Sequence, residues 1–153
     1  MSVPEIPPAW KLPQGVNASL WEYAHTSWLA ESEDGYFADH PLMQVDVDAL
    51  TRRFTTPGPF VDLGCGVGRV ALHFARRGFP TVAVELSHAM LAKVGEKAAV
   101  EGLSLGLVEA NLCRLACFPD ATFTYAASMF STLGMIRGQE ARQRALCEAA
   151  RIL

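Results

Sequence analysis

The sequence predicts an α/β protein in which helices cover both faces of a parallel β-sheet. From residue 60 onward, short apolar segments alternate with segments of helical periodicity. A glycine-rich turn, VDLGCGVGR over residues 61–69, joins the first apolar segment to the first helical one. The chain has 153 residues, half of them hydrophobic, which suits one domain with a sizeable core. Alternating strands and helices form parallel sheets through right-handed crossovers, and these place the carboxyl ends of all strands at one edge.

The N-terminal third is predicted to be an arm followed by helices. Four prolines within the first fifteen residues favour extended or irregular structure. Asn17 is expected to cap a helix that continues to about Ala30. Trp21, His25 and Trp28 would share one face of this helix, and we expect the two tryptophans to belong to the core.

A break and a second helix are predicted before the core begins. Charge and glycine over residues 31–35 are expected to end the first helix, and a second helix is expected over residues 42–54. The segment TTPGP at residues 55–59 would terminate it. We therefore interpret residues 1–58 as an N-terminal arm with a helical lid, and residues 59–153 as the ligand-binding core.

Four strands and three helices are predicted in the core. The strands are expected over residues 60–63, 81–85, 103–108 and 122–129, and Gly106 weakens the third. The helices are expected over residues 67–77, from the cap Ser87 to about residue 100, and over residues 139–152. Gly78 and Gly102 would stop the first and the second of these helices.

The composition argues against several classes of partner. Thirteen Lys and Arg against sixteen Asp and Glu give a net charge of −3, so we expect no nucleic acid. No run approaches the roughly 18 apolar residues of a membrane helix, and the N-terminus lacks the pattern of a signal peptide, so we expect no membrane and a cytoplasmic location. The cysteines lack paired spacing, so we expect free thiols and no metal: Cys65, Cys113, Cys117 and Cys147.

The spacing of the glycines limits the classes of ligand that the turn can bind. Gly64, Gly66 and Gly68 stand on alternate positions, so the dinucleotide pattern G-x-G-x-x-G is not met. No Gly-Lys-Ser/Thr follows, so the phosphate-loop pattern is absent as well. Two alternatives remain: a turn that leaves room for a zwitterionic ligand near a helix N-terminus, or a tight connection that binds nothing.

The turn, together with the acid Asp62 before it, resembles motif I of the class I S-adenosylmethionine-dependent methyltransferases. Glu85-Leu86-Ser87-x-x-Met90-Leu91 after the second strand is similar to the motif II of that family. The resemblance implies a Rossmann-like core, S-adenosyl-L-methionine as cofactor, and a methyltransferase activity. The residues expected to bind the cofactor are Asp62, Gly64, Cys65, Gly66, Gly68, Glu85, Leu86, Met90, Asn111, Leu112 and Ser128.

Several of these positions have an implied role. The carboxylate of Glu85, at the end of the second strand, is expected to accept hydrogen bonds from the ribose hydroxyls. Leu86 and Met90 would pack on the adenine. Asn111 stands where the family usually has Asp, and its side-chain oxygen would accept a bond from the adenine amino group. The backbone amide of Leu112 would serve the adenine ring, and the carbonyl of Ser128 would lie near the cofactor ammonium.

The chemistry implied is transfer of a methyl group from a sulfonium to a small-molecule acceptor by in-line displacement. Much of the acceleration of such a transfer can come from holding the acceptor and the methyl group close together in a dry pocket. We therefore assign no catalytic residue. Candidates for a base, an orienting group or an aromatic wall lie in the lid: Tyr23, His25, Tyr36 and His40. Phe130, Ser131 and Thr132 are candidates to face the substrate.

The resemblance also implies a seven-stranded sheet, and four of these strands are predicted in this sequence. We therefore expect either a fragment of a longer polypeptide, which we favour, or partner chains that complete the sheet by self-association along the fourth-strand edge. The main alternative function is a non-catalytic cofactor-binding or regulatory module. A nicotinamide oxidoreductase is disfavoured by the glycine spacing.

Overall fold

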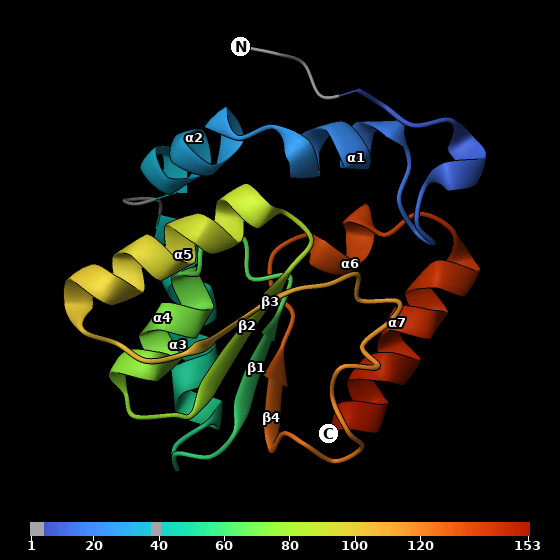
Figure 1. Ribbon diagram of the computed structural model, residues 1–153. Coiled ribbons are helices and arrows are strands. Elements are labelled where there is room, and N and C mark those ends of the chain that lie inside the picture. Colours follow the sequence, from blue (N-terminus) through green and yellow to red (C-terminus); the bar gives the residue numbers. More distant parts are fainter. Residues whose placement is uncertain (1–4, 38–40) are drawn as a thin grey trace.

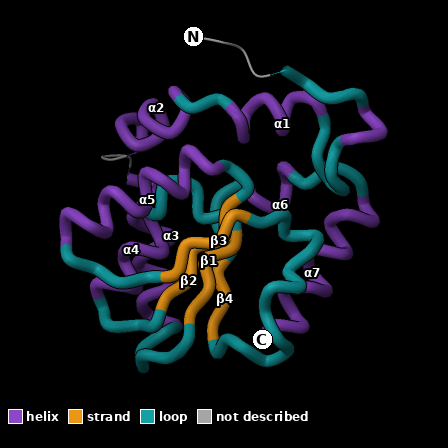
Figure 2. Tube along the Cα trace, in the orientation of Figure 1, coloured by secondary structure: helices purple, strands orange, loops and turns teal. Residues whose placement is uncertain are grey.

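A four-stranded, all-parallel sheet with the order β3-β2-β1-β4 forms the centre of the molecule. The computed structural model describes residues 5–37 and 41–153. Figure 2 shows the strands side by side, surrounded by helices. Phe60 on β1 lies opposite Thr81 on β2 and Tyr125 on β4. The strands are β1 (Phe60–Leu63), β2 (Thr81–Glu85), β3 (Gly106–Glu109) and β4 (Tyr125–Ala127).

Helices pack on both faces of this sheet, as predicted (Figure 1). Every residue of β1 is buried, because the pleat sends its side chains alternately into two apolar layers. Phe60 joins a layer built with α3 and α4, whereas Val61 packs with Ile152 of α7. The helices of the two layers are α3 (Pro41–Arg53), α4 (Arg69–Arg76), α5 (His88–Glu101) and α7 (Gln139–Ile152).

The N-terminal segment crosses one end of the molecule (Figure 1). It consists of a 3-10 turn, η1 (Ala9–Lys11), and two helices, α1 (Ala18–His25) and α2 (Trp28–Phe37), which both pack on α5. Asn17 caps α1 as predicted, because its Oδ1 accepts a bond from the Leu20 amide at 2.9 Å.

The prediction of one helix from residue 17 to about residue 30 is wrong. Thr26 has an extended backbone and its hydroxyl donates to the Glu22 carbonyl at 2.6 Å, which ends α1. The charged segment 31–35 then lies inside α2 instead of breaking a helix. Trp28 is 51% exposed and Trp21 is half-buried, so the prediction that both tryptophans belong to the core is wrong.

Several element boundaries also differ from the prediction. The third strand begins only at Gly106, because the Leu103 amide still bonds to the Ala98 carbonyl at the end of α5. The fourth strand has three residues, since the amides of Phe123 and Thr124 bond to Ile152 and Pro59 outside the sheet. Ser87 stands at the N-cap of α5, but its hydroxyl makes no capping bond.

Two helices also depart from the predicted elements: one follows the glycine turn and the other follows β4. Helix α4 begins at Arg69, because the preceding glycines form the turn. A short helix, α6 (Thr132–Met135), follows β4 and was not predicted. The ranges predicted for the second strand, 81–85, and for the last helix, 139–152, are confirmed.

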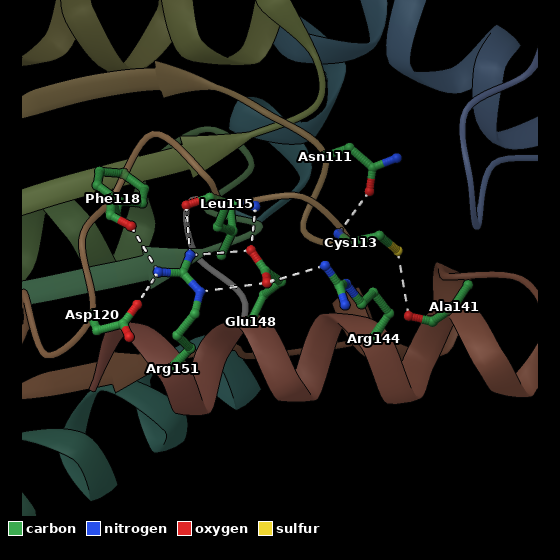
Figure 3. A network of polar contacts seen from close by, with 9 residues as sticks. All are labelled: Asn111, Cys113, Leu115, Phe118, Asp120, Ala141, Arg144, Glu148 and Arg151. Carbon is green, nitrogen blue, oxygen red and sulfur yellow. Dashed lines mark hydrogen bonds and ion pairs between the residues drawn. The ribbon is translucent and has the colours of Figure 1, made fainter.

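The connection between β3 and β4 is fastened to α7 by a polar network (Figure 3). Glu148, buried on α7, accepts a bond from the Leu115 amide at 2.8 Å and pairs with Arg151 at 3.1 Å. Arg151 donates to the carbonyls of Leu115 and Phe118 and pairs with Asp120 at 2.8 Å. The network holds in place the loop that begins with Asn111 at the edge of the sheet.

Candidate cofactor-binding site

A cavity of about 360 Å³ opens at the carboxyl ends of the strands. Its walls come from the glycine turn, from the segments after β2, β3 and β4, and from the N-terminal segment. Of the predicted cofactor-binding residues, those that line it are Asp62, Gly64, Cys65, Gly66, Glu85, Leu86, Met90, Asn111 and Leu112. Gly68 and Ser128 are not among its lining residues.

The three glycines of the turn have different roles, although all have positive φ angles of 53° to 86°. A Cβ atom on Gly64 would lie 2.2 Å from Cγ2 of Thr132, and one on Gly68 would lie 2.8 Å from Cγ2 of Val94. A Cβ atom on Gly66 would meet nothing closer than a Glu33 oxygen at 3.8 Å. Gly64 and Gly68 therefore allow close packing, whereas Gly66 leaves space at the cavity.

Asp62 fastens the turn to the helix behind it. Its side chain is 2% exposed, and Oδ2 accepts a bond from the Ala71 amide at 2.9 Å. Burial raises the pKa of Asp62 to about 7, although the bond from Ala71 and the charge of Arg69 oppose this shift. The carboxyl group thus positions the glycine turn from the wall of the cavity.

Glu85 connects the end of β2 to the glycine turn. Its Oε2 accepts a bond from the Gly66 amide at 2.9 Å, and Oε1 accepts bonds from the amides of Leu86 and Ser87 at 2.7 and 3.1 Å. A carboxylate has about four acceptor positions, so further hydrogen-bond donors can still be bound. The side chain is therefore oriented by three backbone amides before any ligand binds.

The side chain of Asn111 is bonded at both ends. Oδ1 accepts a bond from the Cys113 amide at 2.8 Å, and Nδ2 donates to the Gln14 carbonyl at 2.9 Å. The predicted acceptor atom, Oδ1, thus already accepts one hydrogen bond and can accept a second. The donor bond to the N-terminal arm was not foreseen.

The wall after β4 is built from four consecutive residues, Met129 to Thr132. Phe130 has a φ angle of 60°, which is uncommon outside glycine and marks backbone strain at this edge of the cavity. Thr132 donates through its hydroxyl to the Gly64 carbonyl at 3.3 Å and so joins α6 to the glycine turn. All three candidates for facing the substrate therefore line the cavity.

The N-terminal segment contributes a pair of side chains, of which only Tyr23 was predicted from the sequence. Tyr23 donates a short hydrogen bond to Glu33, and both residues line the cavity. Burial, the bond to Glu33 and its charge raise the pKa of Tyr23 well above its usual value. Burial also raises the pKa of Glu33, although the bond from Tyr23 opposes the shift. Glu33 was overlooked because it stands in a segment read as a charged break.

Of the other candidates in the N-terminal segment, neither His25 nor Tyr36 lines the cavity. His25 is exposed and stacks on Trp21, with ring centroids 3.8 Å apart. Tyr36 is exposed on α2, and His40 lies outside the described residues. All four cysteines are free thiols. In the part of the chain that the structure describes, no helix is long and apolar enough to cross a membrane.

The sequence over residues 60–153 matches a family described as "Methyltransferase domain". No curated protein matches the chain. Among solved structures, a protein of Methanococcus maripaludis classed as an S-adenosyl-L-methionine-dependent methyltransferase has 20% identity and a TM-score of 0.69, over 83% of this chain and 58% of its own. The PH0226 protein of Pyrococcus horikoshii has 23% identity and a TM-score of 0.66, over 75% and 55%.

The CcbJ methyltransferase from Streptomyces caelestis has 28% identity and a TM-score of 0.61, over 70% of this chain and 43% of its own. The chain thus spans about half the length of these solved proteins. The match over residues 60–153 covers every strand and the glycine turn. The chain therefore belongs to the methyltransferase-domain family and has the Rossmann-like fold of the class I S-adenosylmethionine-dependent methyltransferases.

Proposed function

We propose that this chain binds S-adenosyl-L-methionine and serves a methyltransferase that acts on a small-molecule acceptor. The observation that carries the proposal is the meeting of Gly66, Glu85 and Asn111 in the wall of one cavity. The family resemblance assigns these residues to the methionyl, ribose and adenine parts of the cofactor. They come from three separate connections, which only the parallel sheet brings together.

The residues of the cavity fit that cofactor. Gly66 leaves space beside the turn, and Glu85 has acceptor capacity for two neighbouring hydroxyl groups. Leu86 and Met90 supply an apolar surface, and the cavity volume lies within the range of about 300–1,000 Å³ typical of small-ligand sites. When bound, the cofactor supplies a methyl group already activated on a sulfonium.

The lining residues not assigned to the cofactor favour a small molecule as the methyl acceptor. Met129, Met135 and Ile136 line it beside the turn, and Leu20 of α1 also contributes. Apolar side chains exclude water and hold two reacting atoms close together, which is the main requirement of an in-line displacement. Because the N-terminal segment supplies several lining residues, we propose that residues 1–58 act as an arm and lid over a core of residues 59–153.

The test of this proposal is methyl transfer. The full-length protein is incubated with methyl-labelled S-adenosyl-L-methionine and a set of small-molecule acceptors, and the label is followed into the products. Transfer that disappears in a Glu85→Ala variant supports the proposal. Cofactor binding without transfer to any acceptor supports the alternative of a non-catalytic binding module, and a folded protein that does not bind the cofactor contradicts both.

A further inference from the structure

We infer that Asn111 is a latch that closes the N-terminal arm over the cavity, so that it positions the arm as well as facing the ligand. The arm segment concerned is residues 14–16, all three of which line the cavity. The latch is a property of the folded chain alone. Its coupling to ligand binding rests on the proposed function.

The first support is the chemistry of the Asn111 bonds. The side chain uses its oxygen for the Cys113 amide and its nitrogen for the Gln14 carbonyl (2.8 and 2.9 Å). Figure 3 shows the amide nitrogen pointing away from Cys113. Only a group with both an acceptor and a donor serves both partners. An aspartate, usual here in the family, has no proton to donate at neutral pH and would oppose the carbonyl with a charged oxygen.

The second support is an independent anchor on the next residue of the arm. The Gly15 carbonyl accepts a bond from the Arg137 amide at 2.8 Å. Gly15 has a φ angle of 79°, and a Cβ atom there would lie 2.9 Å from Cγ2 of Ile136 and 3.1 Å from Cβ of Ala141. The arm therefore docks too closely for any side chain at this position.

The two anchors join the arm to two different segments of the chain. Asn111 begins the connection after β3, whereas Arg137 lies between α6 and α7. Two successive carbonyls of the arm bridge these segments, so the arm leaves the cavity only when both bonds break. A ligand amino group that donates to Oδ1 of Asn111 would fix the orientation of the amide, with Nδ2 toward Gln14. Ligand binding and arm closure would therefore favour each other.

The latch is tested by hydrogen exchange of the Arg137 amide in the full chain without ligand. Asn111→Asp keeps the acceptor for Cys113 and removes the donor, and we expect exchange to become about tenfold faster. Gln14→Ala is the matched control, because it removes a side chain and keeps the bonded carbonyl, so exchange stays unchanged. Unchanged exchange in Asn111→Asp would overturn the latch.

A double variant separates the latch from general loosening of the structure. Gly15→Ala blocks docking of the arm by a different route, so Gly15→Ala combined with Asn111→Asp should exchange no faster than the faster single variant. If the two increases in exchange rate multiply in the double variant, the two changes do not act on the same latch. If Asn111→Asp does not fold, Asn111→Ser gives the same test, because its hydroxyl can bond to Cys113 and is too short to reach Gln14.

The coupling to ligand is measured separately, as the dissociation rate of S-adenosylhomocysteine. We expect Asn111→Asp to release it about tenfold faster than the wild type. Lys11→Ala, an exposed position of the same arm outside the cavity lining, should release it at the wild-type rate. Equal release rates in Asn111→Asp and the wild type would remove the coupling and leave the latch. A wild type with a protected Arg137 amide that does not bind this ligand would reject the proposed function alone.

Discussion

The Glu85 carboxylate lies 2.9 Å from the amide nitrogen of Gly66, and this contact joins the end of β2 to the glycine turn. It places the acid of one motif beside the most open glycine of the other. Because the amides of Leu86 and Ser87 bind the other carboxylate oxygen, the side chain cannot rotate freely. The two motifs therefore form one preorganised surface.

The glycines of the turn should divide into packing and binding positions. Gly64→Ala is expected to lower the free energy of unfolding by about 2–4 kcal/mol, because the new methyl group meets Thr132 and the backbone has positive φ. Gly66→Ala should cost about 1 kcal/mol and abolish most ligand binding. Urea unfolding and calorimetric titration measure the two effects.

Gly78→Ala is the control for backbone strain alone, since Gly78 has a φ angle of 80° and no atom within 4 Å of an added Cβ. We expect it to cost about 1 kcal/mol and to leave binding unchanged. Equal losses of stability in Gly64→Ala and Gly78→Ala would show that the contact with Thr132 does not matter.

Asp62 should make stability depend on pH in an unusual direction. The folded carboxyl keeps its proton up to about pH 7, whereas the unfolded one loses it near pH 4, so the folded state holds the additional proton between these values. Stability attributable to this group is therefore complete at low pH and decreases as the pH rises toward 7, by at most about 1.4 kcal/mol per pH unit. Asp62→Asn should remove this decrease. Unfolding curves of both proteins that run parallel from pH 4 to 7 would contradict the assignment.

Tyr23 and Glu33 should act as one unit in the N-terminal segment. The bond between them is partly buried, so Tyr23→Phe and Glu33→Gln are each expected to lower the free energy of unfolding by about 1–2 kcal/mol. The double variant should lose little more than the larger single loss, because either change removes the same bond. Urea unfolding of the four proteins gives the coupling energy, and simple additivity would count against it.

Glu148 should stabilise the cavity wall from a distance. Glu148→Ala leaves the Leu115 amide without its acceptor, and we expect a loss of about 1–3 kcal/mol of unfolding free energy, with faster hydrogen exchange at Leu115. Arg144→Ala is the matched control, because Arg144 is exposed and pairs with Glu148 only at 3.7 Å. A control that loses as much stability as Glu148→Ala would indicate that surface charge, and not the buried bond, holds the loop.

The core of the fold was predictable because its signals are local. The apolar run Phe60–Leu63, the β-branched run Thr81–Glu85 and the periodic segment Gln139–Ile152 each form the expected element with the expected bounds. The boundaries that were missed depend on bonds to distant residues. Phe123 pairs with Ile152 at the end of α7, and no neighbouring residue signals that contact.

The residues that line the cavity were predictable mostly where a motif marks them, whereas the contacts of the N-terminal segment were not. Gly64, Gly66 and Glu85 stand in registered motifs and line the cavity, although Gly68 of the same turn does not. Asn111 bonds to Gln14, which lies 97 positions earlier in the chain, and no spacing rule relates them. Glu33 was hidden because a run of charge looks the same whether it is a solvated break or a helix with one face on a cavity.

The central claim is that Glu85 and the glycine turn form one cofactor site, and calorimetric titration with S-adenosylhomocysteine tests it most directly. The wild type should bind, and Glu85→Ala should weaken binding by about 1–3 kcal/mol through loss of charge-assisted hydrogen bonds. Glu109→Ala, at the end of the neighbouring strand and outside the cavity lining, should bind as the wild type does. A folded wild type that does not bind the ligand, or a Glu85→Ala variant with unchanged affinity, would contradict the account.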